Sequence, residues 1–268
     1  MDHTKERAAG TCTPRRRRRR RRAHGFIRIL YLGIFFAVVC LEVCGAKVHE
    51  EPMSALEPAK QPEKQAAEPI QPERSSVSPD DWQVLLVNRW TPIPDGYAFE
   101  RTTLRNGQSV DSRADPDLQE MMDACRAAGL NPRICSSYRT WEKQRELYTN
   151  KIQRLLDEGM PYEDAVGEAG TVVAVPGTSE HQTGLALDIV DTSYQILDEA
   201  QEDTDVQRWL AEHSWEYGFV LRYPSGKSEI TGIIYEPWHY RYVGRTAARE
   251  MTELGLCLEE YVDWLSSR

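Results

Sequence analysis

Cysteine is scarce in this chain. Of six cysteines in 268 residues, three fall within residues 1–46, which leaves only Cys125, Cys135 and Cys257 for the rest. Such an odd, sparse set is not a disulfide scaffold. A Cys125–Cys135 bridge in an oxidising compartment and free, buried thiols both remain open.

Positive charge is scarce beyond the N-terminus. The chain has 33 basic and 42 acidic residues, and eleven of the basic ones, including Arg15–Arg22, lie within residues 1–28 beside Asp2 and Glu6. The remaining residues have 22 basic and 40 acidic side chains and a formal charge of about −18. Because duplex affinity depends on Lys and Arg that neutralise phosphates, this acidic body argues against a nucleic-acid partner.

An uncharged apolar run, Ile29–Leu41, directly follows the arginine block and is itself followed by Gly45 and Ala46. A basic region, a short apolar region and small residues are the layout of a signal peptide. Residues 26–46 are therefore either a cleaved signal peptide or an uncleaved membrane anchor, and a buried core helix is the structural alternative. In the first two cases residues 1–25 form a basic cytoplasmic tail and the rest of the chain is exported.

Residues 47–79 have little apolar content and contain six prolines. A segment of this kind cannot bury enough apolar surface to order itself, so we predict an extended linker. From residue 80 the composition becomes globular, and residues 80–268 are enough for one domain with its own core.

Hydrophobic spacing within 80–268 predicts helices that alternate irregularly with short strands. Helices are predicted at 116–129, 141–157, 162–166, 206–217, 245–255 and 258–266. Strands are predicted at 84–88, 133–136, 185–190, 219–222, 232–234 and 239–243. This irregular order favours an α+β fold over a doubly wound parallel sheet.

Histidine is also scarce, since the predicted domain has only His181, His213 and His239. His181 lies seven positions before Asp188 in the segment 179–188 (SEHQTGLALD), where Asp188 falls in an apolar strand. A buried carboxylate is costly without a partner, so Asp188 is expected to be a metal ligand or a paired acid. His213, on the predicted helix 206–217, has the pattern of a surface or packing residue.

His239 ends the segment 236–239 (EPWH), which begins with Glu236. Pro237 disfavours a helix at the residue before it, so this is not the helical pair of histidines found in HExxH enzymes. An extended or turned segment can aim His239 at a metal and Glu236 at the water beside it. Two imidazoles and one carboxylate with an open fourth position are a usual catalytic zinc set. Each motif alone is a weak signal, and their coincidence is what favours a metal site.

Arg139 lies in a third segment, 136–144 (SSYRTWEKQ), between a predicted strand and a predicted helix. A guanidinium there can hold a substrate carboxylate or the oxyanion of a tetrahedral intermediate. A surface ion pair is the structural alternative.

Taken together, the three segments resemble the signatures of the VanY-type D-alanyl-D-alanine carboxypeptidases. The resemblance extends to four further segments, so that it covers nearly all of residues 82–264. These are Leu86–Trp90, Trp215–Pro224, Tyr240–Gly244 and Gly255–Tyr261.

The resemblance implies a single α+β domain with a central antiparallel sheet, shared with D,D-dipeptidases and the hedgehog signalling domain. It implies one zinc ion and hydrolysis of the terminal D-Ala–D-Ala bond of peptidoglycan stem peptides. By position, His181, Asp188 and His239 are the metal ligands, Glu236 is the general base and Arg139 stabilises the intermediate. Residues expected to line the substrate pocket are Gln144, Ser179, Tyr223 and Trp238. Ser137, where the family often has glycine, is a departure from which we expect no loss of activity.

Three alternatives remain open at this stage: L,D-carboxypeptidase action, endopeptidase action on a crosslink, and a non-catalytic, zinc-containing wall-binding module. The first two differ from the main prediction in pocket shape, which the motifs do not describe. Intact Glu236 and Arg139 argue against the third. We expect a monomer on the extracytoplasmic face of a bacterial membrane or in the cell wall, in contact with the membrane through the N-terminal segment.

Overall fold

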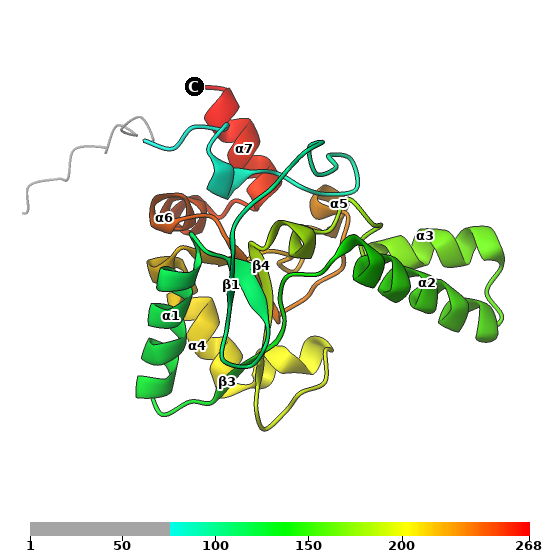
Figure 1. Ribbon diagram of the computed structural model, residues 1–268, viewed down its shortest axis with the longest axis horizontal. Coiled ribbons are helices and arrows are strands. Elements are labelled where there is room, and N and C mark those ends of the chain that lie inside the picture. Colours follow the sequence, from blue (N-terminus) through cyan, green and yellow to red (C-terminus); the bar gives the residue numbers. More distant parts are fainter. Residues whose placement is uncertain (1–75) are drawn as a thin grey trace, which may run out of the picture. The chain divides into compact units, whose positions relative to one another are not determined.

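The computed structural model describes residues 76–268, and its core is a four-stranded antiparallel sheet with the order β3-β4-β6-β5 (Figure 1). The strands are β3 (Pro132–Ser136), β4 (Ala186–Asp191), β5 (Phe219–Leu221) and β6 (His239–Tyr242). A separate hairpin pairs β1 (Arg101–Thr103) with β2 (Ser109–Asp111). The predicted α+β class with a central antiparallel sheet is confirmed.

Seven helices join these strands in the described part of the chain. They are α1 (Asp115–Ala127), α2 (Trp141–Asp157), α3 (Tyr162–Val172), α4 (Asp205–His213), α5 (Ser228–Thr231), α6 (Arg245–Leu254) and α7 (Leu258–Ser266). Four short 3₁₀ turns are interspersed at Trp82–Val84, Glu180–Thr183, Glu199–Asp203 and Ser214–Tyr217.

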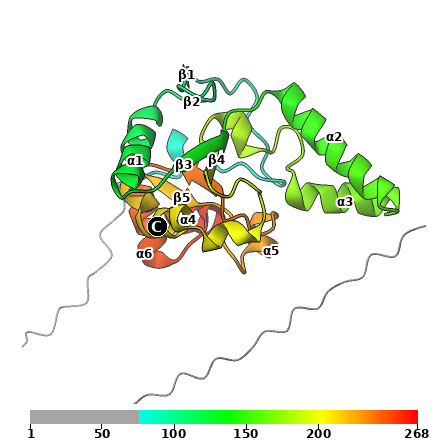
Figure 2. The same cartoon turned by 90° about the horizontal axis from the view of Figure 1, so that it is seen from below.

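The two faces of the sheet have different roles because side chains alternate along each strand. On one face Leu187 and Ile189 of β4 and Tyr240 and Tyr242 of β6 join the main hydrophobic core. Helices α1 and α4 contribute to the same core and lie beside the sheet in both ribbon views (Figures 1 and 2). The residues between these positions on β4 and β6 point to the opposite face of the sheet. They include Asp188, His239 and Arg241.

Two smaller cores complete the domain. One lies under α6 and α7, where Val243, Ala248 and Tyr261 are fully buried. The other joins α2 to α3 through Leu155, Ala165 and Ala169. Figure 2 shows the α2–α3 pair at the side of the sheet opposite to α1.

Two predicted strands are wrong. Val84 instead ends the 3₁₀ turn Trp82–Val84, and residues 85–88 are not in a strand. The carbonyl groups of Gln83 and Leu85, at the start of this segment, accept hydrogen bonds from Nη2 of Arg241. The buried guanidinium of Arg241 thus provides the hydrogen bonds that a neighbouring strand would otherwise give to these carbonyl groups. Residues 232–234 are also not a strand, because Gly232 ends α5 with a φ of 77°.

Three further differences concern lengths and an omission. Helix α3 continues to Val172 rather than ending at residue 166, since Ala165 and Ala169 pack against α2 and outweigh two glycines. The predicted helix 206–217 changes to a 3₁₀ turn after His213, which ends at Gly218 in the left-handed region. The β1–β2 hairpin was not predicted, because its strands have three residues each and little apolar alternation.

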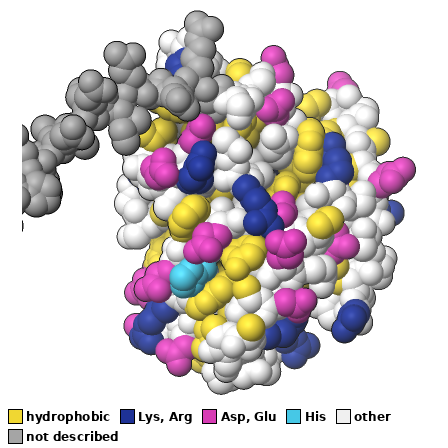
Figure 3. All heavy atoms as spheres, turned by 90° about the vertical axis from the view of Figure 1, so that its left-hand side faces the viewer, with side chains coloured by type: hydrophobic (Ala, Val, Ile, Leu, Met, Phe, Trp, Pro, Cys, Tyr) yellow, Lys and Arg dark blue, Asp and Glu magenta, His cyan; other side chains and the backbone are white. Residues whose placement is uncertain are grey.

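The predicted cytoplasmic tail, signal or anchor segment and nearly all of the predicted linker lie outside the described residues. Within 76–268, none of the helices is long and apolar enough to cross a membrane. Cys125, Cys135 and Cys257 are free thiols, so the alternative without a bridge is the one that the structure has. On the face in Figure 3, Lys and Arg side chains are interspersed with Asp and Glu side chains rather than gathered into a basic patch.

Candidate metal centre

Three adjacent strands bring the first site residues together. The register pairs Ser136 of β3 with Asp188 of β4, and Asp188 with His239 of β6. His181 comes from the 3₁₀ turn Glu180–Thr183 that precedes β4. This turn ends at Gly184, whose φ of 76° lets the chain reverse into the strand.

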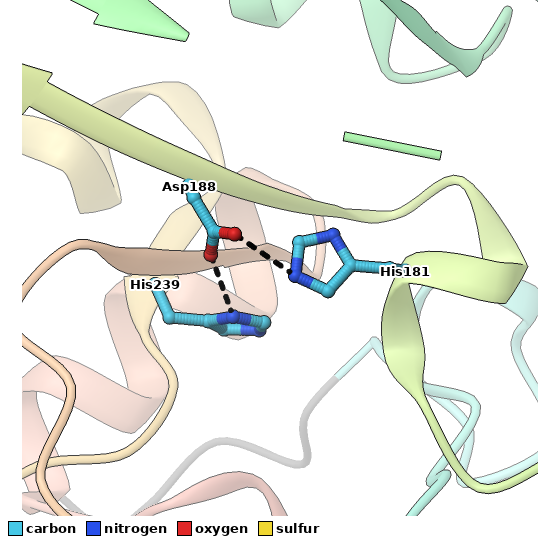
Figure 4. Close-up of side chains that lie close together, drawn as sticks. All are labelled: His181, Asp188 and His239. Carbon is cyan, nitrogen blue, oxygen red and sulfur yellow. Dashed lines mark hydrogen bonds and ion pairs between the residues drawn. The ribbon is translucent and has the colours of Figure 1, made fainter. Parts of the chain in front are cut away.

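His181, Asp188 and His239 point toward one another, as Figure 4 shows. Nε2 of His181 is 3.4 Å from Oδ2 of Asp188, and Nδ1 of His239 is 3.1 Å from Oδ1. One candidate ligand atom from each residue lies within 4.8 Å of the others, and all three residues are buried. The sequence prediction placed these three residues in one site, and the structure brings them together.

These distances fit a small divalent cation. Ligand atoms held ~2.0–2.2 Å from one zinc ion in tetrahedral geometry lie roughly 3.3–3.6 Å from each other. Two imidazoles and a carboxylate without a thiolate are also a set that leaves a fourth position open. Thus His181, Asp188 and His239 can hold one metal ion.

Neighbouring groups fix the orientation of His181 and Asp188. Nδ1 of His181 lies 2.8 Å from the backbone oxygen of Ser137. This contact places the ring proton on Nδ1 and leaves the lone pair of Nε2 for a metal. Nη2 of Arg139 donates to Oδ2 of Asp188 at 2.8 Å and also to Oγ of Ser136. Arg139 therefore lies against a metal-ligand candidate rather than on the open surface.

The Ser137 side chain explains how the site accommodates a departure from glycine. Its hydroxyl is buried, accepts a hydrogen bond from the backbone N–H of Ser109 and donates one to Gln108. The hydroxyl thus ties β2 to the loop that orients His181. The prediction that Ser137 leaves activity intact is not tested by this contact.

The pKa values of the cluster reflect burial and close charges. Burial and the charge of Arg139 lower the pKa of His181 to about 4. Burial alone would also lower the pKa of His239, but the carboxylates of Asp188 and Glu180 outweigh it and raise that pKa to about 9. Burial would raise the pKa of Asp188, yet its histidine and arginine neighbours hold it well below the ordinary range. Without a metal, the site therefore retains a proton on His239.

Glu236 lies beside the three ligand candidates, with Oε2 3.7 Å from Nδ1 of His239. The segment from Glu236 to His239 is a turn in which the His239 N–H donates to the Glu236 carbonyl. This agrees with the non-helical geometry predicted from Pro237. Burial raises the pKa of Glu236 to about 8, and the charge of Asp188 raises it as well, whereas His239 lowers it.

The site opens into a cavity of about 500 Å³. Ser179, Tyr223 and Trp238 line this cavity together with the metal-ligand candidates, Glu236 and Arg139. Gln144, the fourth predicted pocket residue, is fully buried on α2 and does not line the cavity. It instead donates to the carbonyl of Ala174 at 2.7 Å and accepts a weak hydrogen bond from Arg139 at 3.4 Å.

Helix α2, the last residue of α3 and the segment after it form much of the remaining wall, through residues that the sequence analysis did not single out. These are Leu147, Asn150, Lys151, Arg154, Val172, Val173 and Ala174. Leu197 and Ile233 contribute from two further segments. The wall is mixed apolar and polar, which suits a peptide better than a purely apolar ligand.

Sequence reasoning also missed a buried ionic cluster behind the histidines, made of Glu180, Arg222, Arg241 and Glu259. The signal was present, because Arg222 and Arg241 stand among apolar and aromatic residues of strand character. Arginine is almost never fully buried without a partner. Where that partner lies in space is not encoded in local sequence spacing.

The fold and the site together define an α+β domain with a candidate metal centre of two histidines and one aspartate at its central sheet. The family model described as VanY, D-alanyl-D-alanine carboxypeptidase, matches residues 107–245. The chain belongs to this family.

Relatives and solved structures agree with the family. A D-alanyl-D-alanine carboxypeptidase of Enterococcus faecalis is 48% identical over 183 residues, which are 68% of this chain and 66% of that protein. A structure of VanYB in complex with D-alanine-D-alanine has a TM-score of 0.64 and 48% identity, and covers 68% of this chain and 98% of that one. A vancomycin-resistance D,D-pentapeptidase VanY mutant in complex with Zn(II) has a TM-score of 0.63 and 47% identity, and covers 68% and 99%.

A more distant structure broadens the range of activities among similar proteins. The LD-carboxypeptidase LdcB is 33% identical with a TM-score of 0.56, and the match covers 66% of this chain and 84% of that one. The chain spans 52% to 66% of the length of three curated relatives that it matches.

Proposed function

We propose that this chain is a zinc-dependent D,D-carboxypeptidase that removes the terminal D-Ala from peptidoglycan stem peptides. The observation that carries the proposal is the His181–Asp188–His239 cluster, whose ligand atoms have zinc-like spacing and open into a peptide-sized cavity beside Glu236. Support for the metal and the substrate comes from similar structures that contain Zn(II) and D-alanine-D-alanine.

A mechanism follows from the positions of the chain's own residues. A bound zinc ion supplies Lewis-acid chemistry, which polarises a carbonyl group and makes water more acidic. The Glu236 carboxylate takes a proton from the attacking water, whose oxygen forms a bond to the carbonyl carbon of the penultimate D-Ala. Glu236 then returns the proton to the departing amine as the C–N bond breaks.

Arg139 is the second proposed catalytic group. Its guanidinium lines the cavity, and its contacts with Ser136 and Asp188 hold it in place. A fixed positive charge of this kind stabilises the negative charge that develops on the carbonyl oxygen, and it loses little freedom during the reaction. Ser179, Tyr223 and Trp238 are proposed to shape the wall against which the peptide lies.

The test is release of D-Ala from a UDP-linked pentapeptide, measured with and without a chelator. The proposal predicts one D-Ala released per peptide and loss of release in chelator. His181→Ala should lose zinc by elemental analysis, whereas His213→Ala should retain it, because His213 is partly exposed and contacts Glu216. Retained zinc without any release of D-Ala would favour the wall-binding module instead.

L,D-carboxypeptidase action on a tetrapeptide is a second candidate, favoured by the similarity to LdcB. The same metal, base and arginine serve both reactions, so the difference lies in how the cavity accepts the residue before the cleaved bond. Parallel assays with pentapeptide and tetrapeptide distinguish them. A higher kcat/KM for the tetrapeptide would overturn the D,D assignment and leave the metal assignments intact.

We also propose that the domain acts outside the cytoplasmic membrane. This rests on the basic block, the apolar run Ile29–Leu41 and the proline-rich residues that follow. An exported domain would also be on the same side of the membrane as its proposed peptidoglycan substrate.

A further inference from the structure

A buried carboxylate lies behind the metal-ligand candidates. Glu180 precedes His181 in the chain, and its side chain is fully buried. Its Oε1 accepts hydrogen bonds from Nε of Arg222 and Nη1 of Arg241, both at 2.7 Å. Its Oε2 has no hydrogen-bond partner among the described residues.

The candidate hydrogen-bond donor for Oε2 of Glu180 belongs to His239. Nε2 of His239 is likewise buried without a hydrogen-bond partner in the described part of the chain. It lies 3.7 Å from Oε2 of Glu180. That distance is too long for a hydrogen bond, but a small rotation of the imidazole toward the carboxylate shortens it. Two buried polar atoms without partners, facing each other, form an incomplete donor–acceptor pair.

The chemistry of imidazole says which atom carries the proton. A neutral ring has one N–H and one lone pair, on different nitrogens. Nδ1 of His239 faces Asp188 at 3.1 Å, so Nδ1 is the atom directed at the metal position. When Nδ1 gives its lone pair to a metal, the proton must be on Nε2, where Glu180 is the acceptor.

We propose that Glu180 is a positioning residue: it accepts the Nε2–H of His239 and thereby fixes the ring form whose Nδ1 binds the metal. This inference rests on the proposed function only in taking His239 as a ligand. A carboxylate behind a ligand histidine also makes the ligand nitrogen more basic and holds the ring plane.

The two arginines keep Glu180 in the form that this role needs. Both guanidinium groups donate to Oε1 at 2.7 Å, and a guanidinium is a permanent cation that has no acceptor atom. The carboxylate is therefore an anion and accepts hydrogen bonds without donating any. Because both guanidinium groups hold Oε1, the carboxylate cannot turn and Oε2 stays directed at His239.

The cluster extends away from the site to Glu259, which provides a matched control. Glu259 at the start of α7 accepts from Nη1 and Nη2 of Arg222 at 2.8 and 2.7 Å. It also accepts from Asn88 at 3.0 Å. Glu259 thus neutralises the same arginine as Glu180, but its hydrogen bonds are with Arg222 and Asn88 and not with His239. Removing its charge perturbs the cluster without removing the proposed acceptor.

The experiment compares zinc affinity in the full chain and in its Glu180→Gln and Glu259→Gln variants, by competition with a chromogenic chelator. In Glu180→Gln the amide oxygen faces the arginines, which leaves the NH₂ group as a donor opposite Nε2. This arrangement favours the wrong ring form, so zinc affinity should fall about 10- to 100-fold. Glu259→Gln should change zinc affinity less than about threefold, even if thermal stability falls.

A second measurement reads the ring form directly. In the zinc-loaded protein with ¹⁵N-labelled histidine, His239 should show a protonated Nε2 and a metal-bound Nδ1. If Glu180→Gln fails to fold, Glu180→Asp replaces it, since it keeps the charge for the arginines but withdraws the oxygen from His239. The proposal would be overturned if the Glu180 variant bound zinc as tightly as the wild type and Glu259→Gln do. A metal-bound Nε2 in His239 would also overturn it.

Peptide hydrolysis on the same preparations separates this inference from the proposed function. A wild-type protein that binds zinc through Nδ1 of His239 but releases no D-Ala would leave the role of Glu180 intact and refute only the peptidase. A normal rate of D-Ala release with zinc affinity insensitive to Glu180 would refute the positioning role alone.

Discussion

Glu236 is the residue whose environment most directly matches a catalytic task. It is 7% exposed, lines the cavity and lies 3.7 Å from a metal-ligand candidate. With a pKa of about 8 in the metal-free site, its carboxyl group is mostly protonated at neutral pH. A divalent cation in the neighbouring position lowers that pKa, so metal binding and formation of the active base are coupled.

Replacing this carboxylate should separate metal binding from turnover. In Glu236→Ala, zinc content should be unchanged because the three ligand candidates remain. The rate of D-Ala release should fall by about 10²- to 10⁴-fold, the usual contribution of a general acid–base group. Elemental analysis and a single-turnover assay on the same sample check both parts. A variant with the wild-type rate would refute Glu236 as the base.

The raised pKa of His239 gives zinc binding a defined pH dependence. A ligand imidazole must be neutral, but the metal-free ring is protonated below its pKa of about 9. His181, with a pKa of about 4, and Asp188, with a strongly lowered pKa, are already in their ligand forms at neutral pH. Zinc binding therefore displaces about one proton from the histidine cluster, and affinity increases as pH rises toward 9.

Between pH 6 and 8 the zinc dissociation constant should fall by at least about tenfold per pH unit, because His239 loses its proton and the loss of the Glu236 proton steepens the slope further. Chelator competition at three pH values measures the slope. Calorimetry in buffers of different ionisation enthalpy counts the released protons independently. A dissociation constant that does not change over this range would mean that His239 is already neutral in the metal-free protein.

At the scale of elements, the sequence predicted those with strong local periodicity. Helices α2 and α7 have the predicted bounds, Trp141–Asp157 and Leu258–Ser266, because apolar spacing and end signals agree there. The strand predicted at 84–88 is wrong for a tertiary reason, since Arg241, far away in the sequence, binds the carbonyl groups of Gln83 and Leu85 where that segment begins. The site residues were predictable because they stand in compact motifs. The ionic cluster was not, because four distant segments supply it.

Gly184 is the position where an element and the site depend on one another. It ends the 3₁₀ turn that carries His181, with a φ of 76°, and its carbonyl accepts from the Asp111 N–H. A Cβ there would lie 2.9 Å from the Asp111 backbone nitrogen and would overlap the Phe99 ring. Gly184→Ala therefore combines a left-handed backbone with a backbone clash.

We expect Gly184→Ala to lower the free energy of unfolding by at least about 2 kcal/mol and to weaken zinc binding. Gly226→Ala is the control, because Gly226 has a similar φ of 78° but nothing within 4 Å of the added Cβ. It should cost only about 1 kcal/mol, the backbone contribution. Urea unfolding of both variants gives the comparison, and equal losses would show that the Phe99 and Asp111 contacts do not matter.

At the scale of the whole molecule, we expect folding and cellular location to be determined by different parts of the chain. Within residues 76–268, the three hydrophobic cores extend from Val77 to Leu265, and the candidate site lies among them. The basic block and apolar run that predict export lie within residues 1–46. A domain with its own core does not need a remote anchor for stability.

Removal of residues 1–75 should therefore leave catalysis intact and abolish membrane association. The truncated protein should bind zinc and release D-Ala from a soluble pentapeptide at the rate of the full chain, within about twofold, since it keeps the ligand candidates and the cores of residues 76–268. In cells, the full chain should be found with the membrane fraction or outside the cytoplasm, and the truncated chain in the cytoplasm. A truncated protein that folds but loses zinc would show that the N-terminal residues contribute to the site. A full chain found in the cytoplasm would refute the export prediction and leave the metal centre unaffected.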